Sequence, residues 1–143
     1  MIRSCIVFLM ALGVLLAGCS TDYSEYITEL DKYTKILEEA ARLYDAATTK
    51  EDYRTAKEYE SKYDTPQFSV VSDLESKLFA SERKGFSGSM DFLKWKTDSE
   101  GLGKVSKEAH AAFMRNFNAM NKKSLSWSNA LDRLGIEAGS PES

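Results

Sequence analysis

The stretch Asp22–Ala47, DYSEYITELDKYTKILEEAARLYDAA, decides the fold of this chain. Apolar residues recur in it every seven positions in two series, which are Tyr23, Leu30, Leu37, Tyr44 and Tyr26, Tyr33, Ala40, Ala47. This spacing places them along one side of an α-helix. Ile27 and Ala41 widen the stripe beyond the narrow seam of a two-stranded coiled coil, so the pattern predicts a helix that packs within a bundle.

The rest of the chain shows helical periodicity with recognisable ends. Thr48–Glu51 fits a capping box at the start of a second helix, and Pro66 is expected to end that helix. Gly85 is expected to cap the end of a third helix. The predicted helices cover 22–47, 50–63, 69–84 and 104–134, the last with a bend near 122–126. Four amphipathic helices joined mostly by short links predict an all-α fold, an antiparallel bundle of about four helices.

The segment 85–103 differs from the rest because it combines glycines with aromatic side chains. A mobile linker would not be so aromatic, so we expect an ordered loop with a short helical turn near 89–95. Aromatic residues on such a loop can form a recognition patch, which makes Phe86, Phe92 and Trp95 candidate partner-binding residues. The alternative is that these rings close the open end of the bundle.

Two further patterns each have a plain and a functional interpretation. All seven tyrosines lie between Tyr23 and Tyr63, and they predict either a half-wet edge of the core or a tyrosine-lined binding groove. The stretch 22–64 is rich in acidic residues and 104–134 is rich in basic ones. This charge pattern favours complementary packing of the helices, with a basic face for an anionic partner as the alternative.

Composition limits the chemistry that the chain can carry. With 143 residues and a net charge of −3, it fits one domain and has no basic excess typical of nucleic-acid binding. It has one histidine, His110, and two cysteines, without the spacing of a metal site or a catalytic triad. We therefore expect no metal, no cofactor, no nucleic-acid partner and no enzymatic activity.

The first residues read as a targeting signal. Arg3 is followed by an uncharged apolar run, Ile6–Leu16, and by small residues, which is the order of a secretory signal peptide. The tetrapeptide Leu16-Ala17-Gly18-Cys19 resembles the lipobox of bacterial lipoproteins. The resemblance implies a signal peptide over 1–18 and a mature domain over 19–143, whose short C-terminal tail we expect to be disordered.

In that class of protein the cysteine carries the lipid. The resemblance implies that Cys19 is acylated after cleavage and anchors the chain to a membrane, while Cys5 departs with the leader. Ser20 replaces the aspartate that commonly retains such proteins at the inner membrane. This favours the periplasmic face of the outer membrane if the host is Gram-negative.

These observations predict a lipid-anchored, non-enzymatic cell-envelope protein that acts as a protein-interaction or structural module in the periplasm. One alternative is an immunity, inhibitor or exclusion lipoprotein that binds a toxin or an incoming element. Another is a module that binds a glycan or a peptide, which would need a concave, aromatic-lined pocket.

Overall fold

The computed structural model describes residues 20–141, and the leader, the lipobox and Cys19 lie outside this range. Most of the described residues are helical and none forms a strand, which confirms the all-α class. No helix in the described part of the chain is long and apolar enough to span a bilayer.

Helix α2, Ser24–Ala46, forms the spine of the molecule, and its bounds lie close to the predicted 22–47. Its buried side chains follow the predicted heptad stripe and include Tyr26, Leu30, Tyr33, Leu37 and Tyr44. The stripe determines where the helix begins and ends, because the helix is stabilised mainly by burying its apolar face against neighbouring elements.

The next two predicted helices are one continuous rod. It consists of α3, Lys50–Tyr59, the π-helical turn η1, Glu60–Asp64, and α4, Thr65–Leu78. The prediction that Pro66 ends a helix is therefore wrong. A proline ring would clash with the carbonyl four residues earlier in a regular helix, but the wider turn of η1 lies directly before Pro66, and the proline takes a first-turn position of α4.

The last long helix, α8, Lys107–Leu134, starts later than predicted. Ser106 has an extended backbone and its hydroxyl accepts a hydrogen bond from the N–H of Ala109, so it caps α8 and separates it from α7, Leu102–Val105. Gly135 ends α8 in the left-handed conformation, with φ of 63°, as a glycine C-cap does. The helix is continuous through 122–126, where a bend was expected.

The segment between the rod and α8 contains α5, Ala80–Arg83, and α6, Ser89–Thr97. The turn predicted near 89–95 is confirmed as α6, but the helix predicted over 69–84 does not reach Gly85. Its counterpart, α4, ends at Leu78, where the fully buried ring of Phe79 turns into the core and contacts Tyr26 and Trp95.

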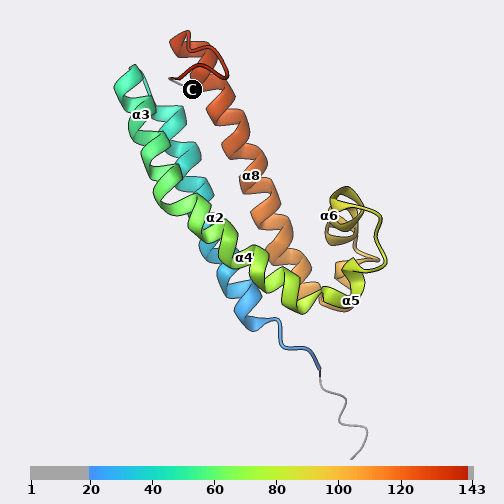
Figure 1. The fold of residues 1–143 in the computed structure, drawn as a ribbon. Coiled ribbons are helices and arrows are strands. Elements are labelled where there is room, and N and C mark those ends of the chain that lie inside the picture. Colours follow the sequence, from blue (N-terminus) through green and yellow to red (C-terminus); the bar gives the residue numbers. More distant parts are fainter. Residues whose placement is uncertain (1–19, 142–143) are drawn as a thin grey trace, which may run out of the picture.

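Two long elements lie against α2, the α3–η1–α4 rod and α8 (Figure 1). Asn116 lies near Leu30 and Arg133 lies near Tyr44, so α8 runs parallel to α2, whereas the α3–η1–α4 rod runs antiparallel to it. Helices α5 to α7 lie toward the end where α2 begins. The expected antiparallel bundle of four helices is not confirmed, because two of its members are one rod.

The core divides into two clusters along α2. One lies near the start of α2 and includes Tyr26, Leu37, Phe79 and Phe113, and the other lies near its end and includes Tyr44. Ile136, directly after α8, is buried in the second cluster, so the chain packs up to that point. The disorder expected beyond it stays a prediction.

Candidate functional site

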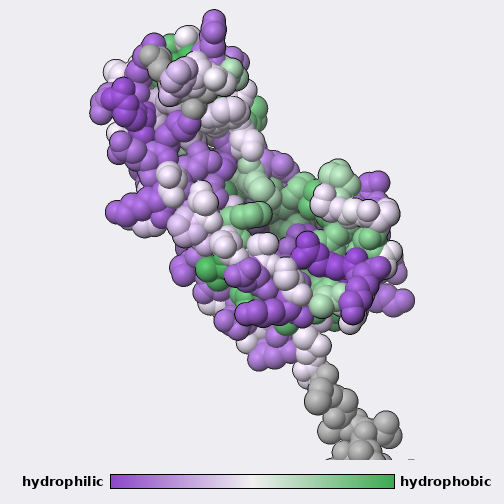
Figure 2. All heavy atoms as spheres, viewed as in Figure 1, coloured by the Kyte–Doolittle hydropathy of each residue, from purple (hydrophilic) through white to green (hydrophobic). Residues whose placement is uncertain are grey.

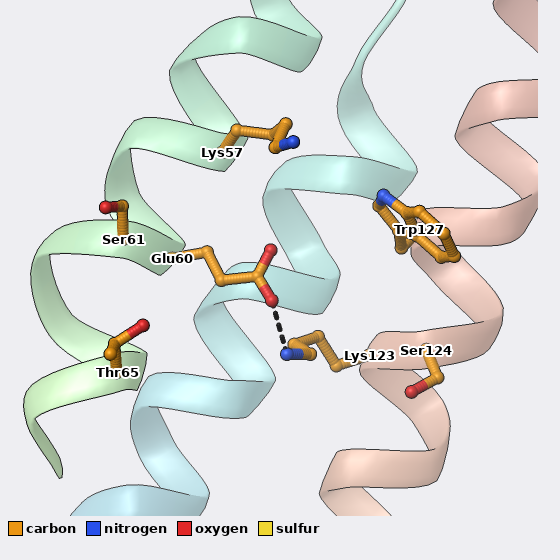
Figure 3. Close-up of a pocket in the computed structure, with 7 residues that line it drawn as sticks. All are labelled: Lys57, Glu60, Ser61, Thr65, Lys123, Ser124 and Trp127. Atoms are coloured by element: carbon orange, nitrogen blue, oxygen red, sulfur yellow. Dashed lines mark hydrogen bonds and ion pairs between the residues drawn. The ribbon is translucent and has the colours of Figure 1, made fainter. Parts of the chain in front are cut away.

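A groove separates α8 from the α3–η1–α4 rod, and its widest part is an open cavity of about 470 Å³. Side chains from both walls line it: Lys57, Glu60, Ser61, Thr65, Lys123, Ser124 and Trp127 (Figure 3). A second open cavity of about 430 Å³ shares Lys57 and Ser61 with the first and continues along α3 to Lys50. The two cavities therefore lie next to each other along the rod, and together they are called the hollow below.

A hydrogen-bonded cluster of charges closes the groove on the side of α2. The Nζ atom of Lys123 donates to Glu60 Oε1 at 2.5 Å and to Asp64 Oδ2 at 2.6 Å. Tyr33 donates to the other oxygen of Asp64 at 2.6 Å, and Tyr44 donates to the other oxygen of Glu60 at 2.5 Å. Each carboxylate oxygen thus has a donor, which is the condition for placing two acids in a protein interior.

The protonation of this cluster follows from its burial and its partners. Burial by itself would lower the pKa of Lys123, but its hydrogen bonds to Asp64 and Glu60 outweigh that effect and raise the pKa above its ordinary value of 10.5. The pKa values of the Tyr33 and Tyr44 hydroxyls are raised far above 10.0. Burial is the larger cause, and the hydrogen-bonded carboxylates are the second. Both tyrosines are therefore neutral donors and Lys123 is a cation at neutral pH.

Trp127 forms part of the α8 wall, where a hydrogen bond fixes its ring. Its indole N–H donates to the hydroxyl of Tyr53 at 2.8 Å, which links α8 to α3. The ring of Tyr53 in turn lies 5.6 Å from the ring of Tyr44. Trp127 and Tyr53 are each fixed by contacts with neighbouring side chains, so this wall of the groove needs no rearrangement before a ligand binds.

The predicted partner-binding residues Phe86, Phe92 and Trp95 lie together in an aromatic cluster at the other end of the molecule. Phe92 is buried and stacks on Trp95 with 5.8 Å between ring centres, and Phe86 lies about 6 Å from both. Trp95 also contacts Phe79. Much of the ring surface of these residues is in contact with the chain itself, and whether they bind a partner stays a prediction.

Gly101 shows how closely Trp95 is packed. A Cβ atom on Gly101 would lie 2.2 Å from the carbonyl oxygen of Trp95 and 2.9 Å from its ring. Both distances are shorter than real contacts, so only glycine fits here without a shift of Trp95.

Exposed apolar side chains occur on several elements. The most exposed large ones are Met90 at 63%, Leu125 at 62% and Phe68 at 56%. Figure 2 shows a hydrophobic area in the middle of one face, between α4, α6 and α8, with hydrophilic residues around it. Such areas are typical of surfaces that contact other molecules.

Other sequence expectations can be compared with the structure. Four of the seven tyrosines, Tyr26, Tyr33, Tyr44 and Tyr53, are buried in the core itself, so the expected half-wet edge is wrong for them. His110 is half-buried beside the Thr97 carbonyl. Within residues 20–141, no group of three His, Cys, Asp or Glu side chains is placed to hold a metal ion.

Sequence analysis did not select Lys123, Glu60 or Asp64. The usable signal was the spacing of Glu60 and Asp64, since acids four residues apart share one face of a helix. Lys123 gave no such signal, because its partners are 59 and 63 residues away in the chain.

No protein-family model, curated protein or solved structure matches this chain.

Proposed function

We propose that this chain is a lipid-anchored, non-enzymatic cell-envelope protein that acts as a protein-interaction or structural module in the periplasm. The observation that carries the proposal is the tetrapeptide Leu16-Ala17-Gly18-Cys19 directly after an apolar leader. Acyl chains on Cys19 would hold the domain at a bilayer, since each buried CH₂ contributes about 0.8 kcal/mol.

The start of α2 supports this arrangement. Helix α2 begins at Ser24, so only Ser20–Tyr23 lie between Cys19 and the helical domain. An extended chain spans at most about 3.6 Å per residue, so a lipid on Cys19 would keep the bundle within roughly 20 Å of the membrane surface. The domain would then work close to the bilayer rather than on a long tether.

The groove supports a non-catalytic role. Glu60 and Asp64 are the acids at its centre, and every one of their carboxylate oxygens accepts a hydrogen bond from Lys123 or a tyrosine. Acids bonded in this way join α8 to the rod, and they are not placed to exchange protons with a substrate. The exposed side chains of Phe68 and Met90 offer the apolar contacts that a protein partner would bury.

The anchoring is tested by Cys19→Ala, with Cys5→Ala in the leader as the matched control. We expect Cys19→Ala to abolish lipid attachment, seen by intact mass and by incorporation of labelled palmitate, and to keep the leader uncut. The Cys5→Ala variant should be processed as the wild type is. Normal processing and membrane attachment of Cys19→Ala would refute the anchor.

The interaction role is tested by site-specific photo-crosslinking in intact cells. A photoreactive amino acid at Met90 or Phe68 should capture a defined envelope protein, because both side chains project from the surface. The same probe at Thr55, an exposed position on α3, is the control. An identical pattern from all three positions would refute a specific interface at either site.

A further inference from the structure

We infer that the groove along α3 binds a linear chain of uncharged or N-acetylated sugars. The site is the hollow formed by the two cavities that share Lys57 and Ser61. This inference goes beyond the proposed function, since it does not require a lipid anchor or a protein partner.

The first argument is that charged side chains of both signs line the hollow. The basic ones are Lys50, Arg54, Lys57 and Lys123, and the acidic ones are Glu58 and Glu60, with Asp64 buried behind the surface. An ionic ligand of either sign would therefore meet like charges as well as opposite ones along the groove. A neutral ligand that only exchanges hydrogen bonds with charged groups meets no such penalty.

The second argument is the kind of polar group that faces the cavity. Ser61, Thr65 and Ser124 line it, and each hydroxyl can both donate and accept a hydrogen bond. Lys123 uses two of its three N–H donors on Glu60 and Asp64 and keeps one for a ligand. Sugar hydroxyls are the ligand groups that match such a mixture of donors and acceptors.

The third argument is the position of Trp127. Its ring lies on the α8 wall across from Lys57 and Glu60 of the rod (Figure 3). The hydrogen bond to Tyr53 fixes the ring, so a ligand does not have to order it. An aromatic face opposite polar side chains suits a sugar ring, which is apolar on its C–H face and polar at its edge.

The fourth argument is the length of the hollow. Its lining residues run from Lys50 to Thr65 along the rod. At 1.5 Å per residue this is roughly 22 Å, which is long enough for several sugar rings in a row. Because both cavities are open to solvent along their length, a chain can lie in the groove without its ends being enclosed.

The same features count against a peptide helix in this groove. A helix that docks in a groove inserts an apolar stripe, and that stripe would have to cover Lys123 and Glu60 at the centre. Burying these charges away from water would cost free energy that the apolar contact would have to offset. We therefore place protein contacts elsewhere on the surface and a glycan here.

The experiment uses the two tryptophans as built-in reporters. The purified full chain, in a detergent without a sugar headgroup, is titrated with tetramers of N-acetylglucosamine and of glucose. Binding is measured by calorimetry and by the indole N–H signals in ¹H–¹⁵N spectra, which Trp95→Phe assigns. We expect saturable binding of at least one tetramer that shifts the Trp127 signal and leaves the Trp95 signal in place.

Ser61→Leu and Thr55→Leu form a matched pair of variants. Both residues are exposed on the rod, but only Ser61 lies where the two cavities meet. We expect Ser61→Leu to weaken binding at least about tenfold, equivalent to 1.4 kcal/mol, and Thr55→Leu to change it by less than about twofold. Circular dichroism checks that both variants are folded.

Four results would overturn the inference. The first is no binding of either tetramer, the second is binding that moves Trp95 instead of Trp127, and the third is equal weakening by both variants. Saturable binding of an acidic peptide at Trp127, with no response to either sugar, would also overturn it. These results are separate from the proposed function, because a Cys19→Ala variant without the lipid would keep the groove.

Discussion

Lys123 of α8 and Asp64 of η1 form an ion pair across the groove, with 2.6 Å between Nζ and Oδ2. Only 15% of the Lys123 side chain and 9% of the Asp64 side chain are exposed. Glu60 binds the same ammonium group, so one lysine neutralises part of the charge of two acids on the rod. This three-residue contact joins α8 to the rod, as the hydrogen bond from Trp127 to Tyr53 does nearer the start of α3.

Replacing Lys123 by methionine should destabilise the fold. The change keeps a long side chain but leaves the buried Asp64 and the partly exposed Glu60 without a cation, and breaking a buried pair in this way costs about 3 kcal/mol. Urea denaturation monitored by circular dichroism measures the loss. Lys122→Met, at the exposed neighbouring position, should change the free energy of unfolding by no more than about 0.5 kcal/mol. Equal effects of the two variants would contradict the role given to Lys123.

Stability should fall in alkaline solution. Tyr33, Tyr44 and Lys123 have pKa values in the folded protein above their ordinary values of 10.0 and 10.5. Their stabilising contribution is therefore complete below about pH 10 and is lost as the pH rises further, because the unfolded chain releases these protons first. Each such group changes the free energy of unfolding by about 1.4 kcal/mol per pH unit in that range.

The measurement is the urea midpoint between about pH 8 and pH 11, compared between the wild type and a Tyr33→Phe/Tyr44→Phe variant. The variant lacks both hydroxyls, so its stability should fall less steeply with pH. The two proteins would instead show the same slope if these hydroxyls did not titrate differently in the folded and unfolded states.

The sequence predicts helix positions correctly where one periodic apolar stripe dominates. It does not predict features that depend on contacts between residues far apart in the chain. The bounds of α2 follow from its heptad series, and α8 ends at Leu134, the predicted end of the last helix. Pro66 was misleading because a π-helical turn can absorb a proline that would otherwise end a helix. The groove cluster joins Lys123 to acids about sixty residues earlier, which no local pattern encodes.

Gly101→Ala should disturb the end of the molecule that holds the aromatic loop. The added methyl group would overlap the Trp95 carbonyl at 2.2 Å, and overpacking of this kind costs about 2 kcal/mol. Thermal unfolding measures the loss, and Trp95 fluorescence reports the local change. Gly88→Ala is the control, because nothing lies within 4 Å of its added Cβ. It should cost less than about 1 kcal/mol, as a change at a helix N-cap does, and an equally large loss would argue against the steric explanation.

Phe92→Ala and Met90→Ala should separate the structural role of the aromatic loop from its interaction role. Phe92 is buried and contacts Trp95, Phe79 and Phe86, so its removal leaves a cavity and costs about 3 kcal/mol. Met90 is 63% exposed, so its removal should change stability by no more than about 0.5 kcal/mol.

Capture of a crosslinked partner then distinguishes the two roles. If only Phe92→Ala loses the partner, the loss reflects unfolding, whereas loss of the partner in a folded Met90→Ala variant would place the partner on this loop. Full capture by both variants, at a temperature where both are folded, would remove Phe92 and Met90 from the interface.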